Sequence, residues 1–155
     1  MTKLLAIADV RGWAYDRRAQ ALKKYAPDDF EVDIAYIIEP GSLDDINGYD
    51  VIYNMEYAMT RRVRLHLDNC GSKAPLINSH NADHRRASPA FDEAREHADF
   101  IIFNNMEAFR HYGSLQGTCN ISNGVDLDLW GVDVPPECRT NLSIWTGGNG
   151  KGYED

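Results

Sequence analysis

Short apolar runs alternate with amphipathic segments along most of the chain, and this alternation limits the possible folds more than any other feature. The first run, residues 4–8, is continuous and ends at Asp9. Such a run is typical of a strand buried on both faces of a parallel sheet. Residues 14–25 follow with apolar side chains at helical spacing, and Pro27 lies just beyond them.

The same pattern repeats toward the carboxyl terminus. It predicts further strands at residues 30–38, 50–53, 75–78, 100–103 and 120–121, and further helices at residues 59–70, 88–98 and 104–113. Strands and helices that alternate in this way predict an α/β fold, a Rossmann-like parallel sheet with helices on both faces. Ligands of such sheets bind beyond the carboxyl ends of the strands, so we expect functional residues in the loops that follow them.

Charge and cysteine content exclude several classes of protein. The formal net charge is −8, which argues against nucleic acid as a partner because phosphate binding needs an excess of Lys and Arg. The three cysteines form no CxxC pair and predict reduced thiols in a cytoplasmic protein. The first apolar run is too short for a signal peptide or a membrane span.

The pattern changes after residue 121. Pro135-Pro136 is typical of a linker, and residues 142–146 form a new apolar strand before a glycine-rich loop that contains Lys151. A strand and a loop without a following helix make an unfinished unit. We therefore expect one domain over residues 1–134, and in residues 135–155 the linker and the first strand of a second domain. The unpaired strand also predicts self-association.

Residues 121–130, ISNGVDLDLW, resemble the I-P-N-G-V-D-x-x-x-F segment of retaining GT-B glycosyltransferases, especially glycosyltransferase family four. Ser122 and Trp130 replace the usual Pro and Phe. Residues 98–102 are similar to the family's A-D-x-v-i strand, and Lys151-Gly152 to its first loop in the carboxyl-terminal domain. The resemblance implies the amino-terminal, acceptor-side half of a GT-B fold.

That resemblance also implies the chemistry. The enzyme would transfer a sugar, with retention, from a nucleotide-sugar co-substrate to an acceptor that is a saccharide or a lipid-linked molecule. It would need no other cofactor and no metal, and the missing carboxyl-terminal domain would hold the donor. We therefore expect no sugar transfer from residues 1–155 alone.

Three residues are candidates for binding the donor phosphates. Gly12 lies between the first strand and the first helix, where a ligand can approach the backbone and helix N–H groups can bind an anion. Arg11 beside it would add positive charge. The resemblance gives Lys151 a similar role in the second domain. A plain tight turn is the alternative at Gly12, and a solvated side chain the alternative at Arg11.

Two further residues are candidates for the catalytic centre. The resemblance implies that His80, after the fourth predicted strand, hydrogen-bonds the transferred sugar or the acceptor. Glu56 follows the third strand and could orient an acceptor hydroxyl or act as a base. Ordinary surface residues are the alternative for both. Asp9 could cap the first helix. His80 and His84 have a spacing that can hold zinc, but no third ligand is evident, so no metal is expected.

Other interpretations remain open. The chain could be a self-contained flavodoxin-like domain that binds a ligand or regulates another protein, or an enzyme with a dinucleotide site at the first loop. The missing GxGxxG pattern argues against the dinucleotide site. The basic segment of residues 60–64 could touch an acidic membrane surface, or could be a solvated helix face.

Overall fold

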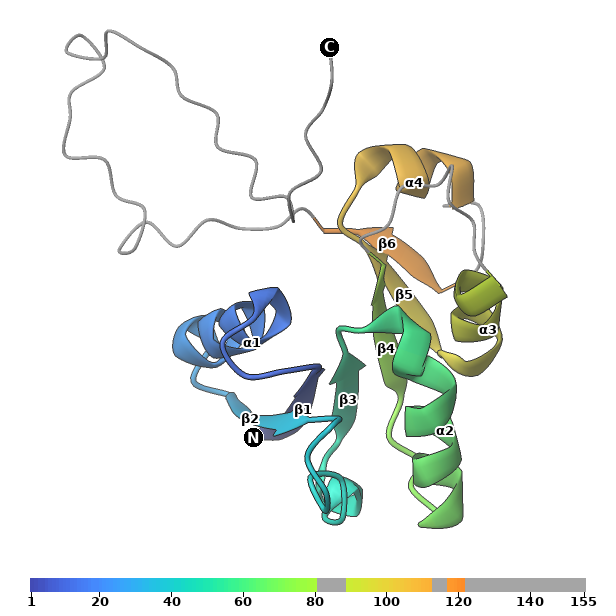
Figure 1. Ribbon diagram of the computed structural model, residues 1–155. Coiled ribbons are helices and arrows are strands. Elements are labelled where there is room, and N and C mark those ends of the chain that lie inside the picture. Colours follow the sequence, from blue (N-terminus) through green and yellow to red (C-terminus); the bar gives the residue numbers. More distant parts are fainter. Residues whose placement is uncertain (81–88, 113–116, 122–155) are drawn as a thin grey trace, which may run out of the picture. The chain divides into compact units, whose positions relative to one another are not determined.

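The computed structural model describes residues 1–80, 89–112 and 117–121, all within the compact unit Met1–Gly124. Its centre is a six-stranded sheet in which every neighbouring pair is parallel (Figure 1). The strands are β1 (Thr2–Ala8), β2 (Phe30–Tyr36), β3 (Val51–Asn54), β4 (Leu76–His80), β5 (Phe100–Phe103) and β6 (Thr118–Asn120). The helices are α1 (Ala14–Tyr25), α2 (Thr60–Asn69), α3 (Pro89–His97) and α4 (Met106–Tyr112), with the 3₁₀ turns η1 (Ile46–Gly48) and η2 (Tyr57–Met59). The predicted α/β class is confirmed.

The helices cover both faces of the sheet because alternate residues of each strand point to opposite sides. Ala19 of α1 packs with Ala6 of β1 in one core cluster. On the other face, Val63 and Leu67 of α2 pack with β1, β3 and β4. A third cluster joins α3 and α4 to β5. Burial on both faces explains why the strands appear in the sequence as continuous apolar runs.

The strand order β2-β1-β3-β4-β5-β6 decides where a ligand can bind. From β1 the chain first goes to one side, to β2, and then returns to the other side, to β3. The segments after β1 and β3 therefore leave the sheet toward opposite faces, with α1 packed on one face and α2 on the other. Such a switch point is the usual ligand site of an open α/β sheet.

All strands except β5 differ in their bounds from the sequence prediction; β4, for example, ends at His80 and not at residue 78. β2 ends at Tyr36 because the chain turns there, with Glu39 donating its backbone N–H to Tyr36 O at 2.8 Å, and Ile38 is left 58% exposed. β6 comes earlier than predicted, at residues 118–120, and Ile121 after it is 53% exposed. The predicted domain boundary at residues 134 and 135 lies outside the described residues.

Candidate functional site

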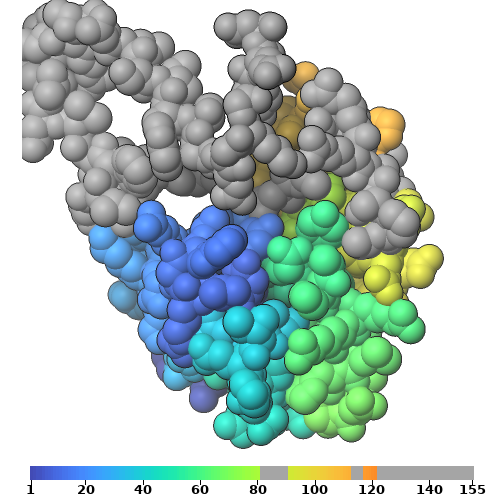
Figure 2. All heavy atoms as spheres, in the orientation of Figure 1, coloured from blue at the N-terminus to red at the C-terminus, as the bar shows by residue number. Residues whose placement is uncertain are grey.

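Three of the predicted site residues lie at or just beyond the carboxyl ends of strands that are neighbours in the sheet. Gly12 follows β1, Glu56 follows β3, and His80 ends β4. Because parallel strands end at the same edge, the fold brings these residues to one side of the sheet, around the switch point between β1 and β3. In the space-filling view the blue amino-terminal residues adjoin the green residues of the β3–α2 region (Figure 2). Lys151 lies outside the described residues.

Gly12 makes the turn between β1 and α1, with a φ of +79°. Its N–H, which the sequence predicts as a donor to an anion, donates to Asp16 Oδ2 at 2.7 Å. Asp16 lies in the first turn of α1, so the helix start already holds a carboxylate of the chain. Asp9 does not cap this helix: the N-cap residue is Trp13, which makes no side-chain capping bond.

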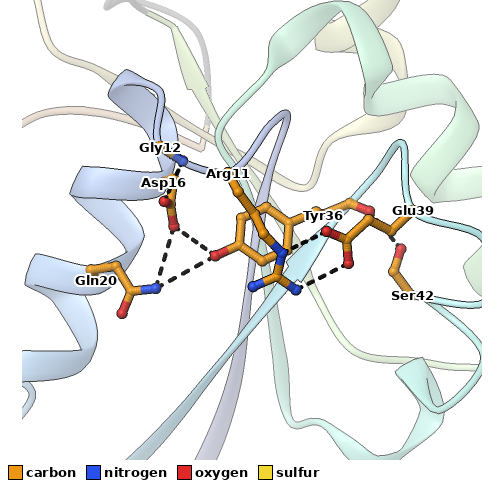
Figure 3. A network of polar contacts seen from close by, with 7 residues as sticks. All are labelled: Arg11, Gly12, Asp16, Gln20, Tyr36, Glu39 and Ser42. Atoms are coloured by element: carbon orange, nitrogen blue, oxygen red, sulfur yellow. Dashed lines mark hydrogen bonds and ion pairs between the residues drawn. The ribbon is translucent and has the colours of Figure 1, made fainter.

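Arg11 is bound by a second carboxylate. Its guanidinium pairs with both oxygens of Glu39, at 2.6 and 3.0 Å, and lies 4.0 Å from the centre of the Tyr36 ring (Figure 3). The Tyr36 hydroxyl donates in turn to Asp16 Oδ1 at 2.6 Å. This bond is the main reason why the pKa of Asp16 is lowered, and burial is the main reason why the pKa of Tyr36 is raised.

The network therefore fills the place where a phosphate was expected. Asp16 takes the N–H of Gly12, and Glu39 neutralises Arg11. Both groups that were expected to bind a phosphate are therefore already bound to carboxylates of the chain. The same arrangement weighs against the dinucleotide interpretation, because a pyrophosphate would meet Asp16 at the start of α1.

The turn at Gly12 can be tested by substitution. A Cβ at Gly12 meets nothing within 4 Å, so Gly12→Ala is strained only through its positive φ. We expect the free energy of unfolding to fall by about 1 kcal/mol. Gly48→Ala is the matched control, because Gly48 also has open space but no positive φ. Chemical denaturation of both variants measures the difference, and equal values would show that the turn is not strained.

Glu56 lies in the loop after β3 and caps η2, since its carboxylate accepts from Ala58 N at 3.1 Å. The residue is half-buried. Burial raises the pKa of this carboxyl group, the Ala58 N–H opposes that rise, and the negative charge of Asp9 adds to it. Two carboxyl groups thus lie near each other at the switch point. One oxygen of Asp9 (Oδ1) is buried and has no hydrogen-bond partner among the described residues.

His80 is buried, with 3% of its surface exposed, so the alternative of an ordinary surface residue is wrong for it. Its ring packs against Tyr57, Phe91 and Phe103, with centroid distances of 5.3, 4.3 and 5.5 Å. Burial lowers the pKa of His80 from 6.5 to about 4, so the imidazole is neutral at physiological pH. Its Nδ1 has no hydrogen-bond partner among the described residues. A ligand can reach this atom only if the covering side chains move.

Beneath His80 and Glu56 lies a buried polar group that the sequence analysis did not identify. Asn54 of β3 and Asn78 of β4 are paired in the sheet register, and both donate their amide to Thr60 Oγ1, at 3.2 and 2.6 Å. Their side-chain oxygens have no hydrogen-bond partner among the described residues. An Asn in or next to each of two consecutive apolar runs was the available signal.

Arg18 is a second residue that sequence reasoning missed. From α1 its Nη2 contacts Tyr53 OH, Ser79 Oγ and Asn104 Oδ1 at 3.2, 3.2 and 3.3 Å. It thereby ties the helix to the carboxyl ends of β3, β4 and β5, on the face opposite His80. Its position on a helix with several charged residues gave no hint of this, because the contacts come from strands far apart in the sequence.

The remaining predictions concern metals and membranes. Within residues 1–80, 89–112 and 117–121, no group of three His, Cys, Asp or Glu side chains could hold a metal ion. None of the helices described is both long and apolar enough to cross a membrane. In the basic segment, Arg61 pairs with Glu93 and Arg64 with Asp99, so acidic residues of the chain already engage two of its three arginines.

Comparison with known proteins identified no relative of this chain. No family model, no curated protein and no solved structure matches the chain.

Proposed function

We propose that this chain is the acceptor-binding, amino-terminal part of a GT-B glycosyltransferase. The observation that carries the proposal is the position of Glu56 and His80 at the carboxyl ends of adjacent strands, beside the switch point of a parallel sheet. The ISNGVDLDLW segment adds the resemblance to retaining transferases. Its residues from 122 onward lie outside the described part of the chain.

In this proposal the edge of the sheet at the β1 and β3 loops binds the hydroxyl groups of the acceptor. Asp9 and Glu56 both present carboxyl oxygens, which accept hydrogen bonds from hydroxyls. Because the pKa of Glu56 is raised, its carboxylate is a stronger base than an ordinary glutamate and can take a proton from an attacking hydroxyl. His80, neutral at physiological pH, would contact the sugar after the side chains over it have moved.

Trp13 supports a saccharide as the acceptor. It lies in the same loop as Gly12 and is 62% exposed, although a large aromatic side chain is normally well buried. An exposed indole offers a flat apolar surface on which a sugar ring can pack. The donor diphosphate would be held elsewhere, by Lys151 and the carboxyl-terminal domain, because the β1 loop already binds carboxylates of the chain.

Binding of saccharides to the 155-residue chain tests the proposal. We expect a panel of saccharides and lipid-linked saccharides, followed by ligand-observed NMR, to contain at least one ligand. Trp13→Ala and Glu56→Gln should each weaken its binding roughly tenfold, the loss expected for one hydrogen bond to a charged group or one packing contact. Glu96→Gln, at an exposed position of α3, is the control. A panel without any ligand would contradict the proposal.

A self-contained binding domain is the second candidate, and the strand order favours it. The order of the first five strands, β2-β1-β3-β4-β5, is that of flavodoxin-like sheets, which also bind their ligand at the β1–β3 switch point. The two candidates differ in their ligands. Binding of FMN or another flat aromatic ligand, without binding of any saccharide, would favour the second candidate.

A further inference from the structure

Tyr36, the last residue of β2, is the point where contacts from the β1 loop (residues 9–13) and from α1 converge. The residue is 3% exposed. The Arg11 guanidinium lies over its ring, 4.0 Å from the centre, and its hydroxyl donates to Asp16 Oδ1 at 2.6 Å (Figure 3). Arg11 belongs to the β1 loop and Asp16 to the first turn of α1. One buried side chain thus contacts the chain on both sides of Trp13.

The carboxylate of Asp16 links Tyr36 to the residue that directly precedes Trp13. Its Oδ1 accepts from the Tyr36 hydroxyl, and its Oδ2 accepts from the N–H of Gly12 at 2.7 Å. Gly12 is the residue whose positive φ makes the turn into α1. Because the acceptor is charged, both bonds are of the stronger, charge-assisted kind. The carboxylate therefore ties this turn to a buried side chain of β2.

The β1 loop has little buried surface to fix it in one conformation. Residues 11–13 are exposed, and Trp13 makes no side-chain capping bond to α1. The backbone N–H of Trp13 bonds to Val10 O at 3.4 Å, which is longer than most N–H···O bonds. Loops with few buried contacts are among the least stable parts of a fold. The position of Trp13 therefore depends on the polar contacts that lead to Tyr36.

We propose that Tyr36 is a positioning residue, which holds the β1 loop in one conformation and keeps the Trp13 indole in place for a sugar ring. The inference rests on the proposed function for its ligand, a saccharide, but the order of the loop can be measured without any ligand. A side chain that is already fixed loses less conformational entropy when a ligand binds. Tyr36 thus raises the affinity for a saccharide without touching it.

The hydroxyl of Tyr36 can be removed without removing the ring. Tyr36→Phe keeps an aromatic face under the Arg11 guanidinium, and Arg11 keeps both of its bonds to Glu39. The substitution deletes the bond to Asp16 and a longer contact from Gln20 Nε2 at 3.4 Å. The bond from Tyr36 is also the largest cause of the lowered pKa of Asp16, so that pKa reports whether the bond is present.

NMR of the 155-residue chain tests the inference. The chain has three tryptophans, and the indole N–H signal that disappears in Trp13→Phe is that of Trp13. We expect this signal to be as ordered as the rigid backbone in the wild type and clearly less ordered in Tyr36→Phe. The pKa of Asp16 should rise toward its ordinary value in the same variant. Tyr49→Phe is the matched control, because it removes a Tyr–Asp bond of 3.1 Å, to Asp33, before the amino end of β3, and it should change neither quantity.

Saccharide binding gives the second readout. Tyr36→Phe should weaken the binding of a saccharide ligand of the wild type roughly threefold to tenfold, the loss expected for one side chain that must be ordered on binding. Tyr49→Phe should leave this affinity unchanged. Asp16→Ala, which breaks the bridge to Gly12 from the other side, should lower the order of Trp13 and the affinity in the same way.

The two readouts separate this inference from the proposed function. Unchanged order of Trp13 in Tyr36→Phe overturns the inference whether or not a saccharide binds, and so does an unchanged affinity after the order is lost. A Trp13 indole that is already mobile in the wild type overturns it as well. A panel without any ligand contradicts the proposed function, and the NMR signal still decides whether Tyr36 positions the loop.

Discussion

The free energy of unfolding should fall by about 3 kcal/mol between pH 7 and pH 4 through His80 alone. In the unfolded chain His80 takes up a proton near pH 6.5, whereas in the fold its pKa is lowered to about 4 by burial. Between these values the unfolded state binds more protons, so stability rises with pH. The contribution is complete above pH 6.5 and is lost as the pH falls toward 4. Each pKa unit corresponds to about 1.4 kcal/mol.

Urea unfolding at pH 7 and at pH 4.5 measures this effect, and a variant isolates it from the titration of carboxylates. His80→Phe places a ring without a titrating group among Tyr57, Phe91 and Phe103, so its stability should depend much less on pH in this range. His80→Leu serves if the larger ring is not accommodated. His111→Gln, at an exposed position of α4, should keep the dependence of the wild type. Equal pH dependence in His80→Phe and the wild type would show that His80 is not held neutral by the fold.

Phe103→Ala should lower the free energy of unfolding by about 3–5 kcal/mol, the usual cost of removing a buried aromatic ring. Phe103 is 0% exposed and ends β5. Its ring centre lies 5.5 Å from that of His80 and 6.2 Å from that of Phe91. The substitution therefore leaves a cavity beside the imidazole. If water enters it, the pKa of His80 should move back toward 6.5.

Phe100→Ala is the matched control, because Phe100 begins the same strand but is 50% exposed. We expect it to cost about half as much as Phe103→Ala or less, because its ring buries about half as much apolar surface and leaves no enclosed cavity. Chemical denaturation gives both free energies, and NMR titration of the His80 ring gives the pKa. A similar loss in the two variants would mean that Phe103 does not hold the third cluster together.

Much of the fold could be predicted from the sequence because the signals were local. The continuous run at residues 4–8 predicts a buried strand, since a parallel sheet is covered on both faces and leaves no polar positions. Pro89 in the first turn of α3 and Gly71 after α2, with a φ of +70°, marked helix ends through their own backbone preferences. The end of β2 was less predictable, because Ile38 continues the alternation although the chain has left the sheet.

The candidate site was only partly predictable. The sequence identified the loops that hold Glu56 and His80, since the carboxyl ends of strands are where ligands of such sheets bind. It did not show that Asp16 would accept the Gly12 N–H or that Glu39 would pair with Arg11, the two groups expected to bind phosphate. Asp16 reaches the Gly12 N–H across the first turn of α1, and Glu39 reaches Arg11 from the turn after β2. A pattern along the sequence does not record such contacts.

The sequence by itself thus determined the class of fold, the order of its elements and the edge of the sheet that carries the candidate residues. Apolar periodicity, glycines and prolines act within a few residues along the chain, so they can be recognised without a structure. Only the tertiary structure decided the protonation of His80, the occupied anion site at Gly12 and the unpartnered oxygens of Asp9 and Asn54. Those properties depend on burial and on partners from other strands, which exist only once the chain has folded.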